Sequence, residues 1–500
     1  MSLYHNSSGT VSLSNLTTYI NSAPSLRDYT GYFHADDNKL NRVWYASAWT
    51  DQLCTIPSDQ GNSLADPGAK STSEPTYWWA NSTLTNGSYA LVDGAKRDKL
   101  IWPGDLGIEI PAVFLSTNEA DIIKISVQQL FAQQNAATGQ MPYAAAPIIM
   151  KPADNEISNL AEEFSFTLGY VDGSGLAYIP VNNRDWLRSD MGYYNIEANS
   201  MLAYTLKAAL ALAEAVSDYS ESANWTTTIN GIEMAANELL WNSAEGLYQD
   251  NENNTSLFPQ DGNVWAIISG VANSTQAATI SNNLRARWGP YGAPAPEAPN
   301  TISPFISSYE LQAHFLAGQP QNAIDLMRFM GADFMLNDPR MTNSTFIEGY
   351  RTDGGLDYRA YSDAARSPGP LLVLSSYVAG LQVLNSTNWI AYPRPGNLSD
   401  VEAGFELDYG RYAASLKVDS SRKSSLSYYV STPKGTTGSI ILDIPEYKAK
   451  IRIVSTTGYE WSETVDAWTG GANPRDVSFW GPQDSTAGTV EVDGLVGGEY

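Results

Sequence analysis

The sequence predicts a mainly α protein in which a long all-helical domain is followed by a smaller antiparallel β domain. From about residue 37 to 390, apolar residues recur at positions i, i+3/i+4 and i+7, the spacing of one helix face. After the Pro/Gly/Asn-rich linker 392–400, apolar and polar residues alternate instead, and turn residues recur at short intervals. With 500 residues and 43% hydrophobic content, the chain can build one large core and a smaller second one.

The individual elements follow from these two periodicities. Helical spacing is found in 38–53, 107–115, 119–134, 195–216, 228–242, 273–288, 304–318, 320–336 and 369–384. The connecting loops are rich in Gly, Pro, Asn and Tyr and are long enough to carry a site at one end of the domain. Strand alternation is found in 411–418, 425–433, 438–445, 449–455 and 488–495. We therefore expect an N-terminal extension at 1–28, which we interpret as the remnant of an upstream β domain, a helical domain at 29–390 and a β-sandwich at 391–500.

The charge balance argues against a polyanionic partner. There are 29 Lys+Arg against 54 Asp+Glu, a formal net charge of −25, which would repel nucleic acid. Neutral carbohydrates suit this chain better, because its 14 Trp, 29 Tyr and 13 Phe offer flat apolar faces for sugar rings. No stretch approaches the roughly 20 consecutive apolar residues of a membrane span, and we expect no membrane partner.

Glycosylation sequons indicate a secreted protein. Asn-x-Ser/Thr occurs at Asn6, Asn15, Asn81, Asn86, Asn224, Asn253, Asn254, Asn273, Asn343, Asn385 and Asn397. The single cysteine, Cys54, excludes an internal disulfide, but a domain of this size is held by its core and needs no such staple. The N-terminus lacks the apolar region of a signal peptide, so we expect the natural chain to extend further upstream. We predict a secreted, extracellular protein that carries N-linked glycans.

One segment, 91–107, concentrates charge in otherwise uncharged surroundings. It reads "LVDGAKRDKLIWPGDLG", and its Gly and Pro residues predict a loop that leads into the helix at 107–115. Carboxylates beside a guanidinium and an indole suit sugar binding, because oxygens fix hydroxyl groups and the ring stacks on a sugar face. A carboxylic acid placed there can protonate a glycosidic oxygen if burial or neighbouring negative charge keeps its pKa high. A solvated charged loop is the plain alternative.

Several separated motifs together resemble the fungal branch of glycoside hydrolase family 78, the α-L-rhamnosidases. They are the run 26–56, "VDGAKRDKLIWPGD" (92–105), "GYYNIEANSMLAYTL" (192–206), "SPFISSYELQAHFLAG" (303–318) and "NSTFIEGY" (343–350), in the order of the family. The resemblance extends, with gaps, from about residue 26 into the β domain. It implies an (α/α)6 barrel of the six-hairpin glycosidase type, followed by a C-terminal antiparallel β-sandwich. It also implies an inverting hydrolase that releases terminal α-L-rhamnose from rhamnosides without a cofactor or metal.

The resemblance also implies roles for individual residues. Asp98 matches the general acid, and Glu348 matches the general base of a late barrel loop. The sugar-binding residues that it implies are Asp93, Arg97, Trp102, Asp105 and, as a stacking aromatic, Trp186. The three histidines, His5, His34 and His314, are far apart in the sequence, which argues against Ser-His-Asp, Cys-His and zinc mechanisms.

The sequence departs from the family pattern at three places. The acid is usually glutamate, and Asp98 is one methylene shorter. Where the fungal pattern has His-Gly-Trp before Ser-Gly-Pro, this chain reads "SDAARSPGP" (362–370), with Ala364 and Arg366 in the places of the histidine and the tryptophan. The stretch 159–175 is shorter than its family counterpart, which suggests a shortened barrel hairpin.

These departures leave other functions open. Arg366 could bind the carboxylate of an acidic sugar next to the scissile bond, which would shift the substrate toward uronate-linked sugars, although an exposed surface arginine is the simpler interpretation. A polysaccharide lyase would use a tyrosine base but would leave the pairing of Asp98 with Glu348 unexplained. A non-catalytic carbohydrate-binding relative would explain the missing histidine and the shortened hairpin.

Overall fold

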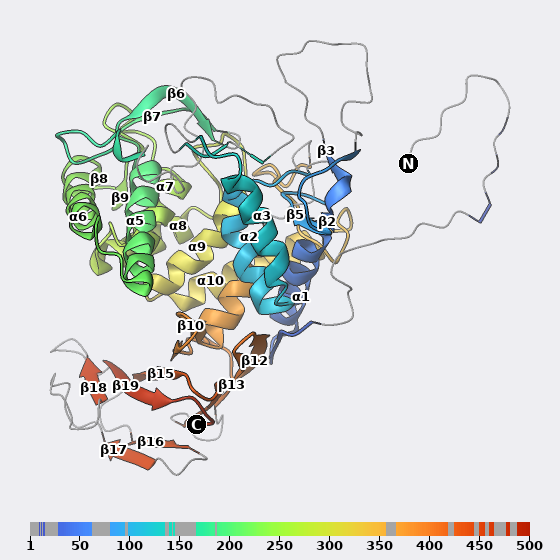
Figure 1. The fold of residues 1–500 in the computed structure, drawn as a ribbon, viewed down its shortest axis with the longest axis vertical. Coiled ribbons are helices and arrows are strands. Elements are labelled where there is room, and N and C mark those ends of the chain that lie inside the picture. Colours follow the sequence, from blue (N-terminus) through green and yellow to red (C-terminus); the bar gives the residue numbers. More distant parts are fainter. Residues whose placement is uncertain are drawn as a thin grey trace.

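A computed structural model shows a helical part at one end of the molecule and two large β sheets at the other (Figure 1). It describes residues 10, 12, 14–15, 29–62, 81–95, 99–135, 140–142, 144–145, 167–185, 188–356, 367–418, 425–444, 450–455, 460–464, 477–480 and 488–500. The predicted N-terminal extension at 1–28 therefore lies almost entirely outside the described residues. Among the described helices, none is both long enough and apolar enough to cross a membrane.

The helices match the predicted stretches closely. They are α1 (Asn38–Leu53), α2 (Pro103–Ser116), α3 (Ala120–Phe131), α5 (Ile196–Val216), α6 (Ser222–Leu239), α7 (Gln260–Ser269), α8 (Ser274–Ala286), α9 (Pro304–Leu316), α10 (Pro320–Leu326) with its π-helical continuation η3 (Met327–Leu336), and α11 (Gly369–Val373) with its π-helical continuation η5 (Leu374–Val378). Proline occupies the first position of α2, α9 and α10, where no backbone N–H is needed. The sequence analysis missed α7, which is short and buried on nearly every face and so lacks an amphipathic pattern.

Two predicted boundaries are wrong for local reasons. The segment before 107 is not all loop, because Pro103 starts α2 four residues earlier and places Asp105 in its first turn. The predicted helix 369–384 ends at Val378. Gly380 follows at φ +86, and a Cβ there would lie 2.3 Å from the nitrogen of Pro393. The chain turns at this glycine and continues as a strand.

The helices form a two-layer arrangement of hairpins. In one layer α5 contacts α7, α7 contacts α9, α9 contacts α11 and α11 contacts α2. The helices that follow in sequence, α3, α6, α8 and α10, pack back on α2, α5, α7 and α9 respectively. Helix α1 contacts α2, α11 and η3. The ends of the first layer are therefore available to carry side chains from several hairpins to one place.

Two β sheets lie below this helical part in Figure 1. One sheet has the order β1 (Tyr32–Ala35), β12 (Asp400–Leu407), β13 (Gly410–Val418) and β14 (Leu426–Ser431). The other has the order β10 (Leu381–Val383), β11 (Asn388–Ala391), β15 (Thr437–Ile444), β19 (Gly488–Val496) and β18 (Val477–Trp480), and β16 (Lys450–Val454) pairs with β17 (Glu460–Thr464). The pairing is antiparallel except between β11 and β15.

Both large sheets contain strands from the range predicted to be helical. β1 precedes α1 in the chain but pairs with β12, with Phe33 opposite Ala403. β10 and β11 also begin before the predicted boundary at residue 390. Strands of three or four residues are too short to show a period of two in the sequence. One buried cluster contains residues of both parts, including Phe33, Trp44, Phe315, Phe405 and Val490.

The helical part also contains short two-stranded sheets. They are β2 (Thr55–Pro57) with β5 (Tyr89–Leu91), β3 (Gly61–Asn62) with β4 (Asn81–Ser82), β6 (Ile179–Asp185) with β7 (Arg188–Tyr193), and β8 (Trp241–Asn242) with β9 (Leu247–Tyr248). Figure 1 shows β3, β6 and β7 at the end of the helical part that is remote from the two large sheets.

Candidate active site

Two hydrogen bonds join Asp93 to Leu100 within the charged segment 93–105. The Asp93 backbone donates to the carbonyl of Leu100 at 3.0 Å, and the Leu100 backbone N–H donates to Asp93 Oδ1 at 3.0 Å. Asp93 is buried, with 6% of its surface exposed. One carboxylate oxygen of Asp93 thus holds the two ends of a loop together. Arg97 and Asp98 lie outside the described residues.

The next two candidate residues lie where this segment enters α2. Trp102 is the N-cap residue, with extended backbone angles, and Asp105 belongs to the first helical turn. A carboxylate is favoured there by the partial positive charge of the helix N-terminus. Asp105 is buried, with 4% of its surface exposed. Burial, together with the charges of Tyr204 and Asp105, raises the pKa of Tyr309, which places Asp105 near the middle of α9.

The segment around Glu348 is held through hydrogen bonds of Phe346, Ile347 and Tyr350. The Phe346 N–H donates to Thr50 Oγ1 at 3.0 Å, near the end of α1. Ser367 Oγ donates to the carbonyl of Ile347 at 3.3 Å, two residues before α11. Tyr350 pairs through its backbone with Ile302, just before α9. Glu348 itself is 5% exposed, and the backbone around it is held close to the starts of α9 and α11.

The structure brings the motif around Asp105 and the segment around Glu348 to the same end of the helical part. Pro103 and Gly104 from the first turn of α2 and Gly369 from the first residue of α11 line one cavity. Ser367, which bonds to the Glu348 segment, directly precedes α11. Trp186 and Arg366, like Arg97 and Asp98, lie outside the described residues, so their positions stay predictions.

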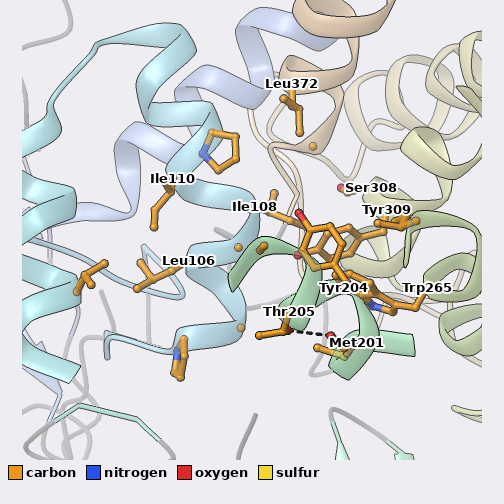
Figure 2. Close-up of a pocket in the computed structure, with 18 of the residues that line it drawn as sticks. Leu106, Ile108, Ile110, Met201, Tyr204, Thr205, Trp265, Ser308, Tyr309 and Leu372 are labelled. Carbon is orange, nitrogen blue, oxygen red and sulfur yellow. Dashed lines mark hydrogen bonds between the residues drawn. The ribbon is translucent and has the colours of Figure 1, made fainter. Parts of the chain in front are cut away.

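That cavity has a volume of about 670 Å³ and runs between α2, α3, α5, α7, α9 and α11. Figure 2 shows Tyr204, Trp265 and Tyr309 on one side of it and Leu106 and Ile110 on the other. The ring centroids of Tyr204 and Trp265 are 5.5 Å apart, and those of Trp265 and Tyr309 are 4.8 Å apart. The lining is mainly apolar and does not include the carboxyl-bearing candidates Asp93, Asp105 and Glu348. The cavity's polar lining residues include Gln134, Thr205 and Gln312.

The sequence analysis missed a buried ionic cluster around Arg188, the first residue of β7. Arg188 Nη1 lies 2.6 Å from Asp261 Oδ2 and 3.3 Å from Glu197 Oε2, and Nη2 pairs with Asp250 Oδ1. Glu297 completes the cluster by accepting the backbone N–H of Gln260 at 2.8 Å and of Asp261 at 3.2 Å. We call Arg188, Glu197, Asp250, Asp261 and Glu297 the Arg188 cluster.

The protonation of the Arg188 cluster reflects its burial. Burial and the charge of Asp261 raise the pKa of Glu297 to about 8, against the opposing charge of Arg188. Burial also raises the pKa of Asp250, again opposed by Arg188. Burial lowers the pKa of Arg188, but Asp261, Glu197 and Asp250 outweigh it and raise this pKa well above its ordinary value. The cluster therefore holds a charged guanidinium beside a carboxyl group, that of Glu297, whose burial favours the protonated form.

A serine, a histidine and a glutamate form a second buried network. Ser281 Oγ lies 2.7 Å from His314 Nδ1, and His314 Nε2 lies 3.2 Å from Glu310 Oε1. This order resembles a catalytic triad, although the sequence argued against one. Ser281 and His314 are completely buried, Glu310 is 1% exposed, and none of the three lines the cavity between α2, α3, α5, α7, α9 and α11. A nucleophile without access to substrate has no catalytic use, so this network serves to join α8 to α9.

Comparison with known proteins finds the same architecture in solved glycosidases. No family model matches the sequence, and no curated protein matches it. The family 78 rhamnosidase of Bacillus sp. GL1 superposes with a TM-score of 0.61 at 19% identity, over 83% of this chain and 43% of that one. The α-L-rhamnosidase of Streptomyces avermitilis, solved with L-rhamnose, gives 0.59 at 13% identity, over 94% and 42%. That of Dictyoglumus thermophilum gives 0.61 at 10% identity, over 95% and 50%.

The chain shares the fold of solved family 78 α-L-rhamnosidases. It spans about half the length of these rhamnosidases or somewhat less. The α-L-rhamnosidase of Aspergillus terreus is similar at a TM-score of 0.55 and 12% identity, a value no higher than those of the bacterial structures. The fold likeness therefore supports the rhamnosidase-like architecture without favouring the fungal branch.

The rhamnosidase-like fold carries no clustered metal ligands in the part of the chain that the structure describes. Within that part, no group of three or more His, Cys, Asp or Glu side chains is arranged to hold a metal ion.

Proposed function

We propose that this chain is the catalytic part of a secreted, inverting glycoside hydrolase that releases terminal α-L-rhamnose. The observation that carries the proposal is the position of Glu348. A nearly buried glutamate lies at the same end of a rhamnosidase-like fold as the first turn of α2, which contains Asp105, about 240 positions earlier in the sequence. In this proposal the helical part is an (α/α)6 barrel, and the two segments meet because the barrel closes.

The mechanism needs two carboxyl groups on opposite faces of the sugar. Asp98 donates a proton to the leaving oxygen while Glu348 takes a proton from a water that attacks the anomeric carbon. An inverting geometry separates the two carboxyl groups by roughly 6.5–9.5 Å, which leaves room for the water. Burial of Glu348 keeps bulk water from competing with the one that reacts.

The remaining residues bind the sugar in this proposal. Asp105, Arg97 and Asp93 hold hydroxyl groups, with Asp93 limited by the oxygen it already shares with Leu100. Trp102 and Trp186 stack on the sugar ring, and the charges of Asp93 and Asp105 favour an oxocarbenium-like transition state. Arg366 sets the preference for a neutral or a uronate-linked neighbour.

The first test is hydrolysis of p-nitrophenyl α-L-rhamnopyranoside by the wild type, Asp98→Asn and Glu348→Gln. Each variant removes one proton-transfer group with little change in shape, so we expect kcat to fall on the order of 100-fold or more in both. The exposed Glu406→Gln, on β12, serves as the matched control and should keep full activity. NMR of the first-formed sugar should show the β anomer. Retention of the α anomer, or full activity in either site variant, would contradict the assigned roles.

Two further results would select another function. L-rhamnose binding without turnover by the folded wild type would indicate a non-catalytic carbohydrate-binding protein. An ultraviolet-absorbing unsaturated product would indicate a lyase. Arg366→Gln should lower the rate on uronate-linked rhamnosides relative to neutral ones, and an unchanged ratio would remove Arg366 from the site.

A further inference from the structure

The cavity between α2, α3, α5, α7, α9 and α11 has two unlike walls. Tyr204, Trp265 and Tyr309 form an aromatic wall, and Leu106 and Ile110 lie on the opposite side (Figure 2). The ring of Trp265 makes interplanar angles of 63° with Tyr204 and 44° with Tyr309. A wall of aromatic rings opposite a wall of aliphatic side chains forms a slot that suits a flat apolar ring, because such rings pack well against both kinds of surface.

Two glycines let α9 approach its neighbours closely at this cavity. A Cβ atom at Gly107, in α2, would lie 2.8 Å from Tyr309 Oη. A Cβ atom at Gly369, the first residue of α11, would lie 2.3 Å from the Cβ of Ser308. A larger residue at either position would displace the wall residue that it meets. Ser308 and Tyr309 are therefore held at the wall by close packing of α9 against α2 and α11.

The described residues that line the cavity carry no charge. None of them is Asp, Glu, Lys, Arg or His, although charged residues make up 17% of the whole sequence. A charged ligand would lose its hydration on entering and would meet no opposite charge among these residues. The lining therefore favours an uncharged occupant.

Two buried hydroxyl groups of the lining offer hydrogen-bond acceptors. Thr205 and Ser308 both line the cavity and are 8% and 5% exposed. Thr205 Oγ1 donates to the carbonyl of Met201 at 2.7 Å, and Ser308 Oγ donates to the carbonyl of Pro304 at 2.8 Å. A hydroxyl group has one hydrogen to donate and two lone pairs to accept with. Since both hydrogens are used within the protein, the two oxygens favour a ligand that itself carries a hydroxyl group.

The size and the opening of the cavity suit a molecule of more than one ring. Its volume of about 670 Å³ lies within the range of roughly 300–1,000 Å³ of small-molecule sites, and an apolar cavity of about 150 Å³ already holds benzene. Phe131 and Tyr204 line the cavity and are exposed large hydrophobic residues. The cavity therefore reaches the protein surface between α3 and α5.

We propose that this cavity is a binding site for an uncharged, planar aromatic molecule that carries a hydroxyl group. The ring system lies between the aromatic wall and the aliphatic wall, and its hydroxyl group donates to Thr205 or Ser308. The described lining includes none of Asp93, Asp105 and Glu348. The site is therefore separate from these carboxyl groups and goes beyond the proposed hydrolase, whose activity it does not require.

Calorimetric titration with three probes of one ring system tests the class of ligand. We expect 2-naphthol to bind about fivefold more tightly than naphthalene, which is the gain from one hydrogen bond. The anion 2-naphthoate should bind at least about tenfold more weakly than 2-naphthol. Binding of 2-naphthol should also raise the midpoint of thermal unfolding. Absence of 2-naphthol binding to the folded protein, or equal affinity for 2-naphthoate, would overturn the proposal.

A pair of matched variants on α5 locates the bound probe. Ala208 lines the cavity, whereas Ala211 is exposed on the same helix and is not among the described lining residues. Ala208→Phe places a ring in the cavity and should weaken 2-naphthol binding about tenfold or more. Ala211→Phe makes the same change outside the cavity and should keep the affinity of the wild type. Equal affinities of the two variants would show that 2-naphthol binds elsewhere.

The double variant Thr205→Val/Ser308→Ala tests the hydroxyl contacts. It removes both acceptor oxygens with little change in shape, so it should bind naphthalene like the wild type but lose the preference for 2-naphthol. A preserved preference would contradict the assigned acceptors.

Competition with L-rhamnose separates this site from the proposed sugar site. L-rhamnose should not displace bound 2-naphthol from the wild type, and displacement would place the probe in the sugar site and overturn a separate one. None of these measurements uses hydrolysis. A wild type that hydrolyses no rhamnoside but binds 2-naphthol as expected would thus contradict the proposed function alone.

Discussion

At the scale of single residues, the buried carboxyl groups of the helical part have different structural roles. Asp93 closes a loop, Asp105 begins a helix, and Glu297 caps the first N–H groups of α7 within the Arg188 cluster. Glu348 is buried, and its segment is held by the hydrogen bonds of Phe346 to Thr50 and of Ile347 to Ser367.

The raised pKa of Glu297 predicts that the free energy of unfolding is larger at acidic than at alkaline pH. Its pKa is raised from 4.5 to about 8 in the folded protein, by burial first and by Asp261 second. The folded state therefore binds more protons than the unfolded state between these values, and the stability from this group is complete below the lower value and lost as the pH rises through the upper one. We expect the free energy of unfolding to fall between pH 5 and 8 by up to about 1.4 kcal/mol per pH unit.

Urea unfolding at several pH values measures this slope. Glu297→Gln removes the titrating group and should flatten the curve, whereas Glu406→Gln, exposed on β12, should leave the slope of the wild type. A stability that rises from pH 5 to pH 8 in the wild type would show that Glu297 is not protonated in the fold.

At the scale of elements, helix α8 starts with a complete capping box. The Asn273 side chain accepts the N–H groups of Thr275 and Gln276, and the Gln276 side chain accepts the backbone N–H of Asn273. Asn273 is also one of the predicted glycosylation sites, because Ser274 and Thr275 follow it. The same residue thus serves the helix through its oxygen and offers its amide nitrogen to a glycan.

The capping role can be separated from the sequon. In protein made without glycans, Asn273→Ala should lower the free energy of unfolding by about 1 kcal/mol, because two N–H groups lose their acceptor. Thr275→Ala destroys the sequon but keeps the cap, and it should stay within about 0.5 kcal/mol of the wild type. Equal losses in chemical denaturation of the two variants would contradict the capping role.

At the scale of the whole molecule, the helical part and the sheets share one core. β1 precedes α1 in the sequence but pairs with β12. The buried cluster that contains Phe33 also contains residues of α1, α9, β12 and β19. A continuous core makes the two parts unfold together, since neither can lose its contacts without exposing the other.

Phe33→Ala tests this continuity. Phe33 is 1% exposed, and its truncation should cost about 3–5 kcal/mol. Circular dichroism of the helices and tryptophan fluorescence should show coincident transitions before and after the substitution. A loss confined to one signal, or two separate midpoints, would show that the parts unfold independently.

The sequence by itself determined the order of the elements and named the segments that contain the candidate site residues. Helical and strand periodicities are local, so α1 and α5 and strands such as β13 could be predicted within a few residues. The charged segment before α2 and Glu348 were identified from their residue types and from a family resemblance. Periodicity in the sequence does not reveal every element. Helix α7 and the strands β1, β10 and β11 are too short or too uniformly buried to show a period.

Only the tertiary structure decided which of these residues meet. Arg188 contacts carboxylates 9, 62 and 73 positions away, and the Glu348 segment contacts Thr50 from 296 positions away in the sequence. Such pairings depend on how the helical hairpins close, and no local pattern encodes that closure. Burial then raised the pKa of Glu297 and of Asp250, because the cost of a charge depends on the surroundings that the fold assembles around it.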